Sequence, residues 1–294
     1  MQAKNTAQGQ VIKGYGGVYY VDIGDRVVEC NSRGRLKLLG DIYIGDYVDV
    51  ELFKNGKGAI ASIHERINNL VRPYVSNIDA IIICIAPVPA PDYLLVDKLL
   101  IGCIKENIEA IICINKIDMV DADFLAYVHR NYSDVASIVE VSATTGQGMD
   151  ELGKAIYGKF VAFSGQSAVG KSSIINTLLD KHLEVGELSK KTLRGKHTTR
   201  YIEIFKVGGN TRIADTCGFS VLELPLIEPC ELSEYFIDFE DTSKRCRFKG
   251  CSHINEPDCA VKVAVENGFI SQERYDRYVK LYKDLEERWR NRYE

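Results

Sequence analysis

Short apolar runs that alternate with polar positions dominate the first part of the chain. Between residues 11 and 62, glycines and other turn residues separate VIKG, VYYVDI, RVVECNS and DYVDVELF. Alternation with a period of two predicts β-strands, and strands this short and closely spaced are typical of a small closed barrel. About five strands fit into the segment, so we expect an N-terminal β-barrel of the OB-fold type.

The expected barrel carries side chains suited to nucleic acid. Such barrels bind single-stranded nucleic acid through stacked aromatic rings and through charges that follow the backbone. The candidates are Lys13, Arg26, Arg33, Arg35, Lys37, Tyr15, Tyr19 and Tyr20. In the alternative interpretation the tyrosines pack the barrel and the charges only solvate it.

The hydrophobic pattern changes near residue 71, where apolar, β-branched runs alternate with segments of helical length. The runs are AIIICIA (80–86), AIICIN (110–115), SIVEVS (137–142), FVAFSG (160–165), YIEIFKVG (201–208) and TRIADT (211–216). They indicate an α/β unit with a largely parallel sheet covered on both faces. In such sheets, ligands bind in the loops at the strand ends.

One of these loops carries a phosphate-binding motif. Gly165-x-x-x-x-Gly170-Lys171-Ser172 follows the strand FVAFS and opens the helical run SSIINTLLD. Backbone N–H groups and the helix N-terminus would hold the phosphates, Lys171 would neutralise the β and γ phosphates, and Ser172 would ligate Mg²⁺. The predicted binding residues here are Ser164, Gly165, Gln166, Ser167, Ala168, Val169, Gly170, Lys171, Ser172 and Ser173.

Two other strand ends indicate guanine as the base. The motif Asn115-Lys116-Ile117-Asp118 follows the strand AIICI, and its Asp118 carboxylate can accept hydrogen bonds from guanine N1–H and the 2-amino group. Adenine lacks this donor pair, so the contact disfavours ATP and an ATP-dependent kinase. Ser142 and Ala143 end the next strand, where a backbone N–H would support guanine O6.

Two segments downstream of the phosphate loop are candidate switches. Asp215 ends the strand TRIA, where a carboxylate can hold Mg²⁺ through water and the Gly218 N–H can meet the γ-phosphate. In the segment GKHTTR one threonine would cover Mg²⁺. We favour Thr199, which adjoins the arginine, and Thr198 is the alternative.

The expected catalytic apparatus lacks one group. Small regulatory GTPases use a glutamine to orient the attacking water, but this chain has Phe219 at that place. We expect slow intrinsic hydrolysis and a partner that supplies or orders the missing group. His197 in the first switch is the best candidate within the chain for orienting the water. In the alternative interpretation, His197 is only an exposed histidine of a loop.

Cysteines and a histidine cluster near the C-terminus. The chain has 9 cysteines, an odd number, which argues for thiols or metal ligands rather than a disulfide framework. Cys246, Cys251, His253 and Cys259 follow the pattern C-x4-C-x-H-x5-C. Three thiolates and an imidazole suit a closed tetrahedral Zn²⁺ site, which is structural because it keeps no open position for water.

The last segment, residues 271–294, predicts an amphipathic helix. Its apolar stripe consists of Tyr275, Tyr278, Tyr282, Leu285 and Trp289. We expect this stripe to pack against the zinc element. Three arginines lie near the helix end: Arg288, Arg290 and Arg292. They either contact RNA or only stabilise the helix C-terminus through their positive charge.

Charge and hydropathy restrict the location and the partners. Lys and Arg total 37 against 41 Asp and Glu, so any binding to nucleic acid depends on local patches. The N-terminus MQAKNTAQGQ lacks the apolar core of a secretory signal, and the run AIIICIAPVPAP is too short to span a bilayer. We expect a cytoplasmic, monomeric protein without membrane contact.

The order of these motifs resembles the RsgA/YjeQ (YloQ-type) family of circularly permuted, ribosome-associated GTPases. The matching segments are NKID (115–118), VSATTG (141–146), SGQSAVGKSS (164–173), RGKHTTR (194–200) and DTCGF (215–219), with the cysteine/histidine cluster. In most GTPases the phosphate loop precedes the NKxD motif, whereas here it follows. Permutation is permissible because the termini of compact domains often lie close together.

The resemblance implies a division of the chain, a function and a set of ligands. The expected parts are an OB barrel (1–70), a permuted P-loop GTPase domain (71–222) and a zinc-binding helical region (223–294). The implied function is hydrolysis of GTP to GDP and phosphate in late maturation of the small ribosomal subunit. Implied ligands and partners are GTP or GDP with Mg²⁺, one structural Zn²⁺, and the small subunit with its 16S rRNA.

The same resemblance supports the zinc assignment, since the four cysteine and histidine positions match the zinc ligands of the family.

An alternative function from another class is an rRNA-binding adaptor that uses GTP only as a structural or regulatory ligand. Intact Lys171, Ser172 and Asp215 favour the enzyme.

Overall fold

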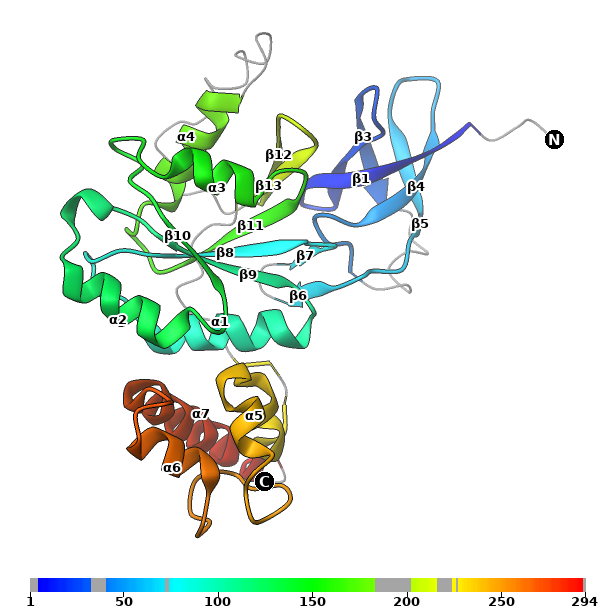
Figure 1. Cartoon of the computed structure of the whole chain (residues 1–294). Coiled ribbons are helices and arrows are strands. Elements are labelled where there is room, and N and C mark those ends of the chain that lie inside the picture. Colours follow the sequence, from blue (N-terminus) through cyan, green and yellow to red (C-terminus); the bar gives the residue numbers. More distant parts are fainter. Residues whose placement is uncertain are drawn as a thin grey trace.

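The computed structural model describes residues 5–32, 41–71, 74–182, 202–215, 224–225 and 227–292. A β-barrel lies at one side of an α/β body, and a helical C-terminal region packs beneath that body (Figure 1). The arrangement follows from the alternation of hydrophobic patterns along the chain.

The N-terminal barrel is built from the five strands described before residue 64. They are β1 (Thr6–Tyr15), β2 (Val18–Asp22), β3 (Val27–Ser32), β4 (Tyr47–Leu52) and β5 (Gly58–Ile63). The strand order is β1-β2-β3-β5-β4, and β4 pairs again with β1, so the barrel closes. Strands β3 and β5 are parallel and the other pairs antiparallel, which confirms the expected barrel.

The α/β body contains every strand that the apolar runs predict. They are β8 (Ala80–Ile85), β9 (Glu109–Ile114), β10 (Ser137–Glu140), β11 (Phe160–Gly165), β12 (Glu203–Val207) and β13 (Thr211–Asp215). The order is β10-β9-β8-β11-β13-β12, and only β12 among these runs antiparallel to its neighbours. Strand β11 is therefore central, and the loops that follow β9, β10 and β11 lie at one edge, where β13 ends at Asp215.

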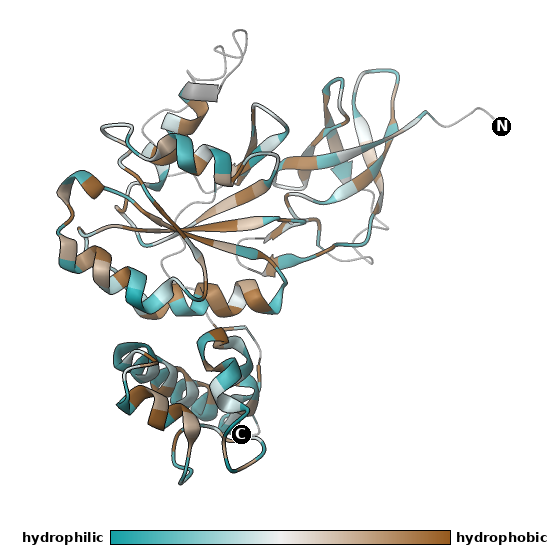
Figure 2. Ribbon diagram, viewed as in Figure 1, coloured by the Kyte–Doolittle hydropathy of each residue, from teal (hydrophilic) through white to brown (hydrophobic). Residues whose placement is uncertain are grey.

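Helices cover both faces of this sheet (Figure 1). Helices α1 (Tyr93–Lys105) and α2 (Ala122–Tyr132) lie on one face, and α3 (Met149–Ala155) and α4 (Lys171–His182) on the other. Strand β8 is buried throughout because Ile81 and Ile83 join the core beneath α1, while Ile82 and Cys84 join the core beneath α4. Figure 2 shows these central strands as largely brown, apolar ribbons, whereas the helices around them mix teal and brown residues.

The barrel and the α/β body share one continuous sheet. Strand β1 pairs antiparallel with β12 at Lys13 and Glu203, which joins the described strands of both parts into an 11-stranded sheet. The Lys13 ammonium also lies 3.2 Å from the Glu203 carboxylate. A separate hairpin of β6 (Asn69–Val71) and β7 (Tyr74–Ser76) lies between the two parts.

The C-terminal region has its own core beneath α1. Its elements are η4 (Pro229–Tyr235), η5 (Ile237–Phe239), α5 (Glu240–Ser243), α6 (Ala260–Glu266) and α7 (Gln272–Arg290). The predicted stripe on the last helix is confirmed, because Tyr278 and Leu285 are buried and Tyr275, Tyr282 and Trp289 are half-buried. Ile101 of α1 belongs to the same core, so this region packs directly on the α/β body.

Candidate functional site

The phosphate loop joins the end of β11 to the start of α4. Gly165 and Gly170 have positive φ values, 126° and 96°. A Cβ on Gly165 would lie 2.2 Å from the Cys84 carbonyl oxygen, and one on Gly170 would lie 2.3 Å from the Asn115 amide nitrogen. Neither position accommodates a side chain, so the loop backbone is packed directly against β8 and the Asn115 motif.

Lys171 lies at the centre of the loop. Its Nζ donates hydrogen bonds to the carbonyl oxygens of Gly165 at 2.7 Å and Gln166 at 2.6 Å. Burial lowers the pKa of the Lys171 ammonium, and the negative charge of nearby Asp215 opposes this shift. Asp215 ends β13 beside the loop. A phosphate group would give this half-buried ammonium a stronger partner than two neutral carbonyls.

Asn115 connects the phosphate loop to both predicted guanine loops. Its side chain is 2% exposed. The amide Nδ2 donates to the Val169 carbonyl at 2.8 Å, and Oδ1 accepts from the Ala143 N–H at 3.1 Å. One side chain therefore fixes the three loops at a single edge of the sheet.

Lys116 and Asp118 extend this contact towards solvent. Lys116 adopts a left-handed conformation, with φ of 65°, and its Nζ donates to the Ala168 carbonyl at 3.0 Å. Asp118 lies in the short helix η2 (Ile117–Met119), and its side chain is exposed. The carboxylate is thus open to a base that lies over the Asn115–Lys116 backbone.

The Ser142–Ala143 loop follows β10. Ser142 is fully buried, and its Oγ accepts from the Thr145 N–H at 3.1 Å. Thr177 of α4 donates to the Ala143 carbonyl at 3.4 Å. The helix that begins in the phosphate loop therefore also contacts the second guanine loop.

The structure brings most predicted nucleotide residues together, and some lie outside the described residues. Residues 164–173, Asn115, Lys116, Asp118, Ser142, Ala143 and Asp215 gather at the carboxyl edge of the sheet. The switch candidates His197, Thr198, Thr199 and Gly218 lie outside the described residues. Their roles stay predictions.

Removing the Asn115 side chain should weaken nucleotide binding. The variant Asn115→Ala leaves the Val169 carbonyl and the Ala143 N–H without their partner, each at a cost of about 1–3 kcal/mol. We expect affinity for GDP to fall about 10- to 100-fold, measured by titration calorimetry. Asn68→Ala is the control, because Asn68 is also buried and, among the described residues, its side chain bonds to the Ile78 backbone, away from the nucleotide motifs. Equal losses in both variants would contradict the bridging role.

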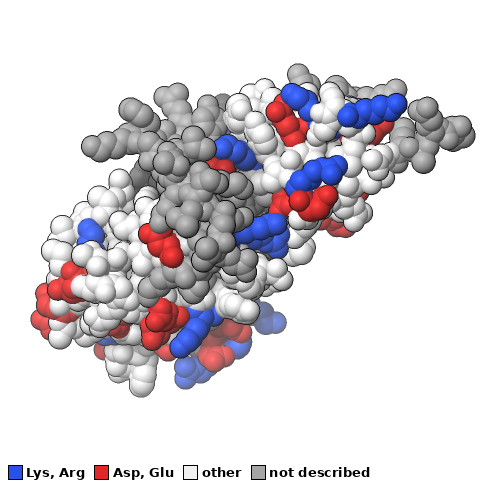
Figure 3. All heavy atoms as spheres, turned by 90° about the horizontal axis from the view of Figure 1, so that it is seen from above, with Lys and Arg blue, Asp and Glu red and all other residues white. Residues whose placement is uncertain are grey.

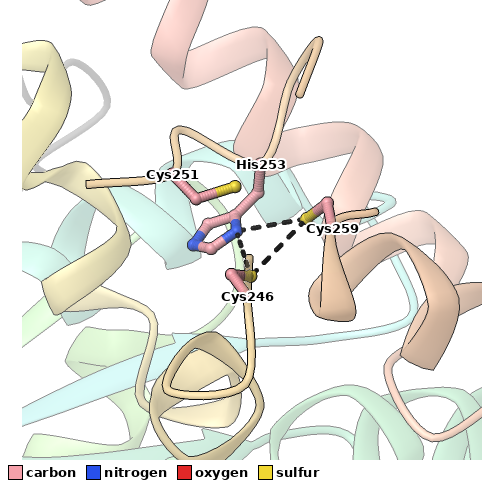
Figure 4. A group of neighbouring side chains, drawn as sticks. All are labelled: Cys246, Cys251, His253 and Cys259. Carbon is pink, nitrogen blue, oxygen red and sulfur yellow. Dashed lines mark hydrogen bonds between the residues drawn. The ribbon is translucent and has the colours of Figure 1, made fainter. Parts of the chain in front are cut away.

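The predicted metal ligands form a second cluster (Figure 4). The ligand atoms of Cys246, Cys251, His253 and Cys259 all lie within 4.8 Å of one another. His253 turns its Nδ1 towards the sulfurs, 3.3 Å from Cys259 Sγ and 3.6 Å from Cys246 Sγ. Burial raises the pKa of the Cys251 thiol to about 12, so a cation is needed to hold its thiolate form at neutral pH. The donor set fits Zn²⁺.

Backbone contacts hold the loop that presents His253. The Tyr275 hydroxyl donates to the His253 carbonyl at 2.7 Å, and the Tyr278 hydroxyl donates to the Ser252 carbonyl at 2.6 Å. Burial would raise the pKa of Glu256, but bonds from Ser252 and neighbouring backbone N–H groups outweigh it and lower the pKa to about 2. The predicted packing of the last helix against this element is confirmed.

Comparison with known proteins identifies the family. The RsgA GTPase family matches residues 63–225, and the RsgA N-terminal domain matches residues 8–60. The chain belongs to the RsgA GTPase family. Members of this family are named GTPases, and the chain is a GTP hydrolase.

Relatives and solved structures extend over nearly the whole chain. "Small ribosomal subunit biogenesis GTPase RsgA" of Alkaliphilus metalliredigens is 39% identical over 286 residues, 95% of this chain and 98% of that protein. The protein of the same name from Geobacillus kaustophilus is 41% identical over 291 residues, 96% of this chain and 98% of its own.

Two solved structures share the fold. YjeQ from Thermotoga maritima has a TM-score of 0.81 and 34% identity, covering 95% of this chain and 98% of its own. YloQ, described as a circularly permuted GTPase, has a TM-score of 0.78 and 30% identity, covering 98% of both chains. The permuted order of motifs is thus a property shared with a solved RsgA-type structure.

The barrel candidates of this RsgA-family chain are only partly available to a ligand. Lys13 faces Glu203, and the Arg26 guanidinium lies 3.4 Å from Asp25. Tyr15 and Tyr20 form a stacked pair with ring centroids 6.0 Å apart, and Tyr15 is 44% exposed. Tyr19 packs against the core, while Arg33, Arg35 and Lys37 lie outside the described residues.

Charge on the face above the sheet is mixed. In Figure 3, lysine and arginine side chains alternate with aspartate and glutamate over the described surface. No helix in the described part of the chain is long and apolar enough to cross a membrane.

The sequence interpretation missed one contact of Gln166. Its side-chain Oε1 accepts a hydrogen bond from the Asp92 N–H at 3.0 Å, at the start of α1. A glutamine in the variable part of the motif gives no sequence signal for this contact, because the partner lies 74 residues away.

Proposed function

We propose that this chain is a GTPase that acts in biogenesis of the small ribosomal subunit, releasing GDP and phosphate. The observation that carries the GTPase assignment is the Asn115 side chain, which joins the phosphate loop to the Ala143 loop. This contact forms a single site for phosphates and guanine although the motifs occur in reversed order. The ribosomal role is supported by relatives named for that process.

We assign the following roles at this site. Lys171 binds the β and γ phosphates, and Asp118 accepts the guanine N1–H and 2-amino protons, with the Ala143 N–H near O6. Ser172 and Thr199, or Thr198 in its place, are the direct Mg²⁺ ligands, and Asp215 acts through water. Bound Mg²⁺ would neutralise charge on the β and γ phosphates. His197 is the proposed group that a docked partner orders beside the attacking water.

We propose one structural Zn²⁺ per chain in the cluster of Cys246, Cys251, His253 and Cys259. With every predicted ligand supplied by protein, such a site has no position for substrate. Its role would be to hold the C-terminal region in one fold.

We further propose the division into an OB barrel (1–70), a GTPase domain (71–222) and a zinc-binding region (223–294). The barrel and the C-terminal region would contact 16S rRNA, with the Tyr15–Tyr20 pair as a stacking surface and Arg288, Arg290 and Arg292 as phosphate contacts. The protein would act as a monomer in the cytoplasm without membrane contact.

The proposed function is tested by phosphate release with and without isolated small ribosomal subunits. We expect turnover of GTP but not ATP, strong stimulation by the subunits, and a loss of about 10²- to 10³-fold in Lys171→Ala. Lys159→Ala, which removes a surface lysine paired with Glu109, should behave like wild type. Stimulation that is absent with wild-type protein would favour the adaptor. If the subunits stimulated His197→Ala as strongly as wild type, His197 would have no part in the mechanism.

A further inference from the structure

A buried carboxylate fixes the C-terminal region to the α/β body. Asp97 of α1 is 1% exposed, and its two oxygens accept hydrogen bonds from different arginines of α7. Arg274 Nη1 lies 2.6 Å from Oδ1, and Arg277 Nε lies 2.5 Å from Oδ2. Buried charges are tolerated only in well-defined geometry. Helix α7 therefore has one strongly preferred position on α1.

Aromatic and polar groups complete this cluster. The Arg274 guanidinium lies over the Phe236 ring at 4.8 Å, and its Nε donates to Asp238 Oδ2 at 2.8 Å. Arg277 donates to the Tyr127 hydroxyl at 3.1 Å and to Asn131 Oδ1 at 3.3 Å, both on α2. Directional contacts thus hold α7 against both helices of this face.

The N-terminus of α1, just over one turn before Asp97, is attached to the nucleotide site. Asp92 is the N-cap residue, since its side chain accepts from the Leu95 N–H at 3.1 Å. The Asp92 N–H in turn donates to Gln166 Oε1 at 3.0 Å. The Gln166 carbonyl accepts from Lys171 Nζ at 2.6 Å. A single glutamine therefore contacts both the phosphate-binding lysine and the start of α1.

A second contact reaches the same segment from the guanine motif. Lys116 Nζ donates to the Val88 carbonyl at 2.5 Å, in the stretch between β8 and α1. Lys116 Nζ also bonds to the Ala168 carbonyl of the phosphate loop. Both nucleotide motifs therefore restrain the segment that leads into α1.

We propose that the N-terminal part of α1 transmits movement between the phosphate loop and the C-terminal region, with Gln166 at the start of the helix and Asp97 in its second turn as positioning residues. Asp92 and Asp97 are five residues apart, about 7.5 Å along the helix axis. The helix resists bending over so short a distance, so movement at Asp92 is passed to Asp97. When phosphates take over Lys171, the Gln166 carbonyl loses its partner, and Gln166 and Asp92 shift together. Linkage requires the reverse effect as well: the position of α7 alters nucleotide affinity.

This inference deepens the proposed function and rests on it only in that the site binds guanine nucleotide. The first test uses Trp289, the only tryptophan of the chain, which lies in α7. Saturating GDP should change Trp289 emission in the full-length wild-type protein. Gln166→Met keeps the side-chain length but removes the acceptor, and it should abolish the change. Binding itself is followed independently with a fluorescent GDP analogue.

The outcomes of this experiment separate the two proposals. Wild-type protein that binds GDP without a change at Trp289, or an unchanged response in Gln166→Met, would overturn the coupling through α1 and leave the GTPase assignment intact. Wild-type protein that binds no GDP would overturn the proposed function, and the coupling with it.

The second test is a double-mutant cycle on GTP hydrolysis. Asp97→Asn and Gln166→Met should each raise KM for GTP about fivefold, within the usual range of coupling between sites. Because both act through α1, the double variant should also show about a fivefold effect. If the two positions acted independently, their effects would multiply and KM for GTP would rise about twenty-five-fold in the double variant. That result would overturn the proposal.

Controls distinguish positioning from general loss of stability. Asp46→Asn breaks a comparable buried pair in the barrel, where Arg66 Nε lies 2.7 Å from the Asp46 carboxylate, and KM should not change. Arg277→Met provides a milder variant should Asp97→Asn fail to fold, because Arg274 still neutralises Asp97. Arg277→Lys should restore part of the coupling. An altered KM in Asp46→Asn equal to that of Asp97→Asn would contradict the assignment.

Discussion

Removing zinc should unfold the C-terminal region and leave the barrel and the α/β body folded. Structural Zn²⁺ sites bind with about 10–16 kcal/mol, which in a small element is largely its folding energy. The core around Phe239 and Tyr278 lies beside His253, with ring centroids 6.1 and 6.3 Å from the imidazole. Loss of the metal therefore loosens this core together with the loop.

The measurement combines zinc analysis, circular dichroism and limited proteolysis. Treatment with a strong chelator should release about one zinc per chain, lower the helical signal and open residues 227–292 to protease. Cys259→Ser should reproduce this state without chelator. Cys230→Ser is the matched control, since Cys230 is an exposed cysteine outside the cluster. Metal-free protein that keeps its melting curve and its protease resistance would contradict a structural site.

The zinc cluster and the phosphate loop could be predicted from sequence because their residues are close together in the chain. Cys246 and Cys259 are 13 residues apart, and the loop from Gly165 to Ser172 lies on a single strand–helix connection. The meeting of Asn115 with this loop was also predictable in outline. Carboxyl ends of parallel strands share one edge of a sheet, whatever the order of the strands in the chain.

Contacts between distant parts of the chain could not be predicted in the same way. Lys13 was one of the candidates for contact with nucleic acid, and the structure pairs it with Glu203, 190 residues away, because β1 extends the sheet at β12. The pairing depends on strand register, which is set by the packed fold and not by local pattern.

The buried cluster at Asp97 left only a weak signal. A lone aspartate in the apolar run YLLVDKLLIG is costly unless it is paired. Its partners, Arg274 and Arg277, lie 177 and 180 residues away. In the sequence, both resemble the solvent-facing charges of an amphipathic helix. The sequence thus indicated a need for a partner without indicating which one.

Replacing Asp118 by asparagine should change the base preference from guanine to xanthine. The carboxylate would accept two hydrogen bonds from guanine, each worth about 1.5–3 kcal/mol for a charged acceptor. In Asp118→Asn one of these acceptors becomes an amide donor that faces a donor of guanine. We expect kcat/KM for GTP to fall about 10²- to 10⁴-fold.

Xanthine should restore activity because it carries a carbonyl oxygen where guanine has its 2-amino group. The asparagine Nδ2 can donate to that oxygen, while Oδ1 accepts from N1–H, so both bonds form again. Hydrolysis of XTP and GTP by each variant, measured as phosphate release, gives the ratio directly. We expect Asp118→Asn to prefer XTP and wild type to prefer GTP.

Asp121→Asn is the matched control for this change. Asp121 is a nearby acidic residue that caps α2, with its side chain accepting from the Phe124 N–H at 2.8 Å. Asparagine caps helices as well as aspartate, so the fold and the preference for GTP should persist. If Asp118→Asn retained its preference for GTP, or if Asp121→Asn changed it equally, the base would not lie against Asp118. The guanine assignment would then depend on the Ser142–Ala143 loop alone.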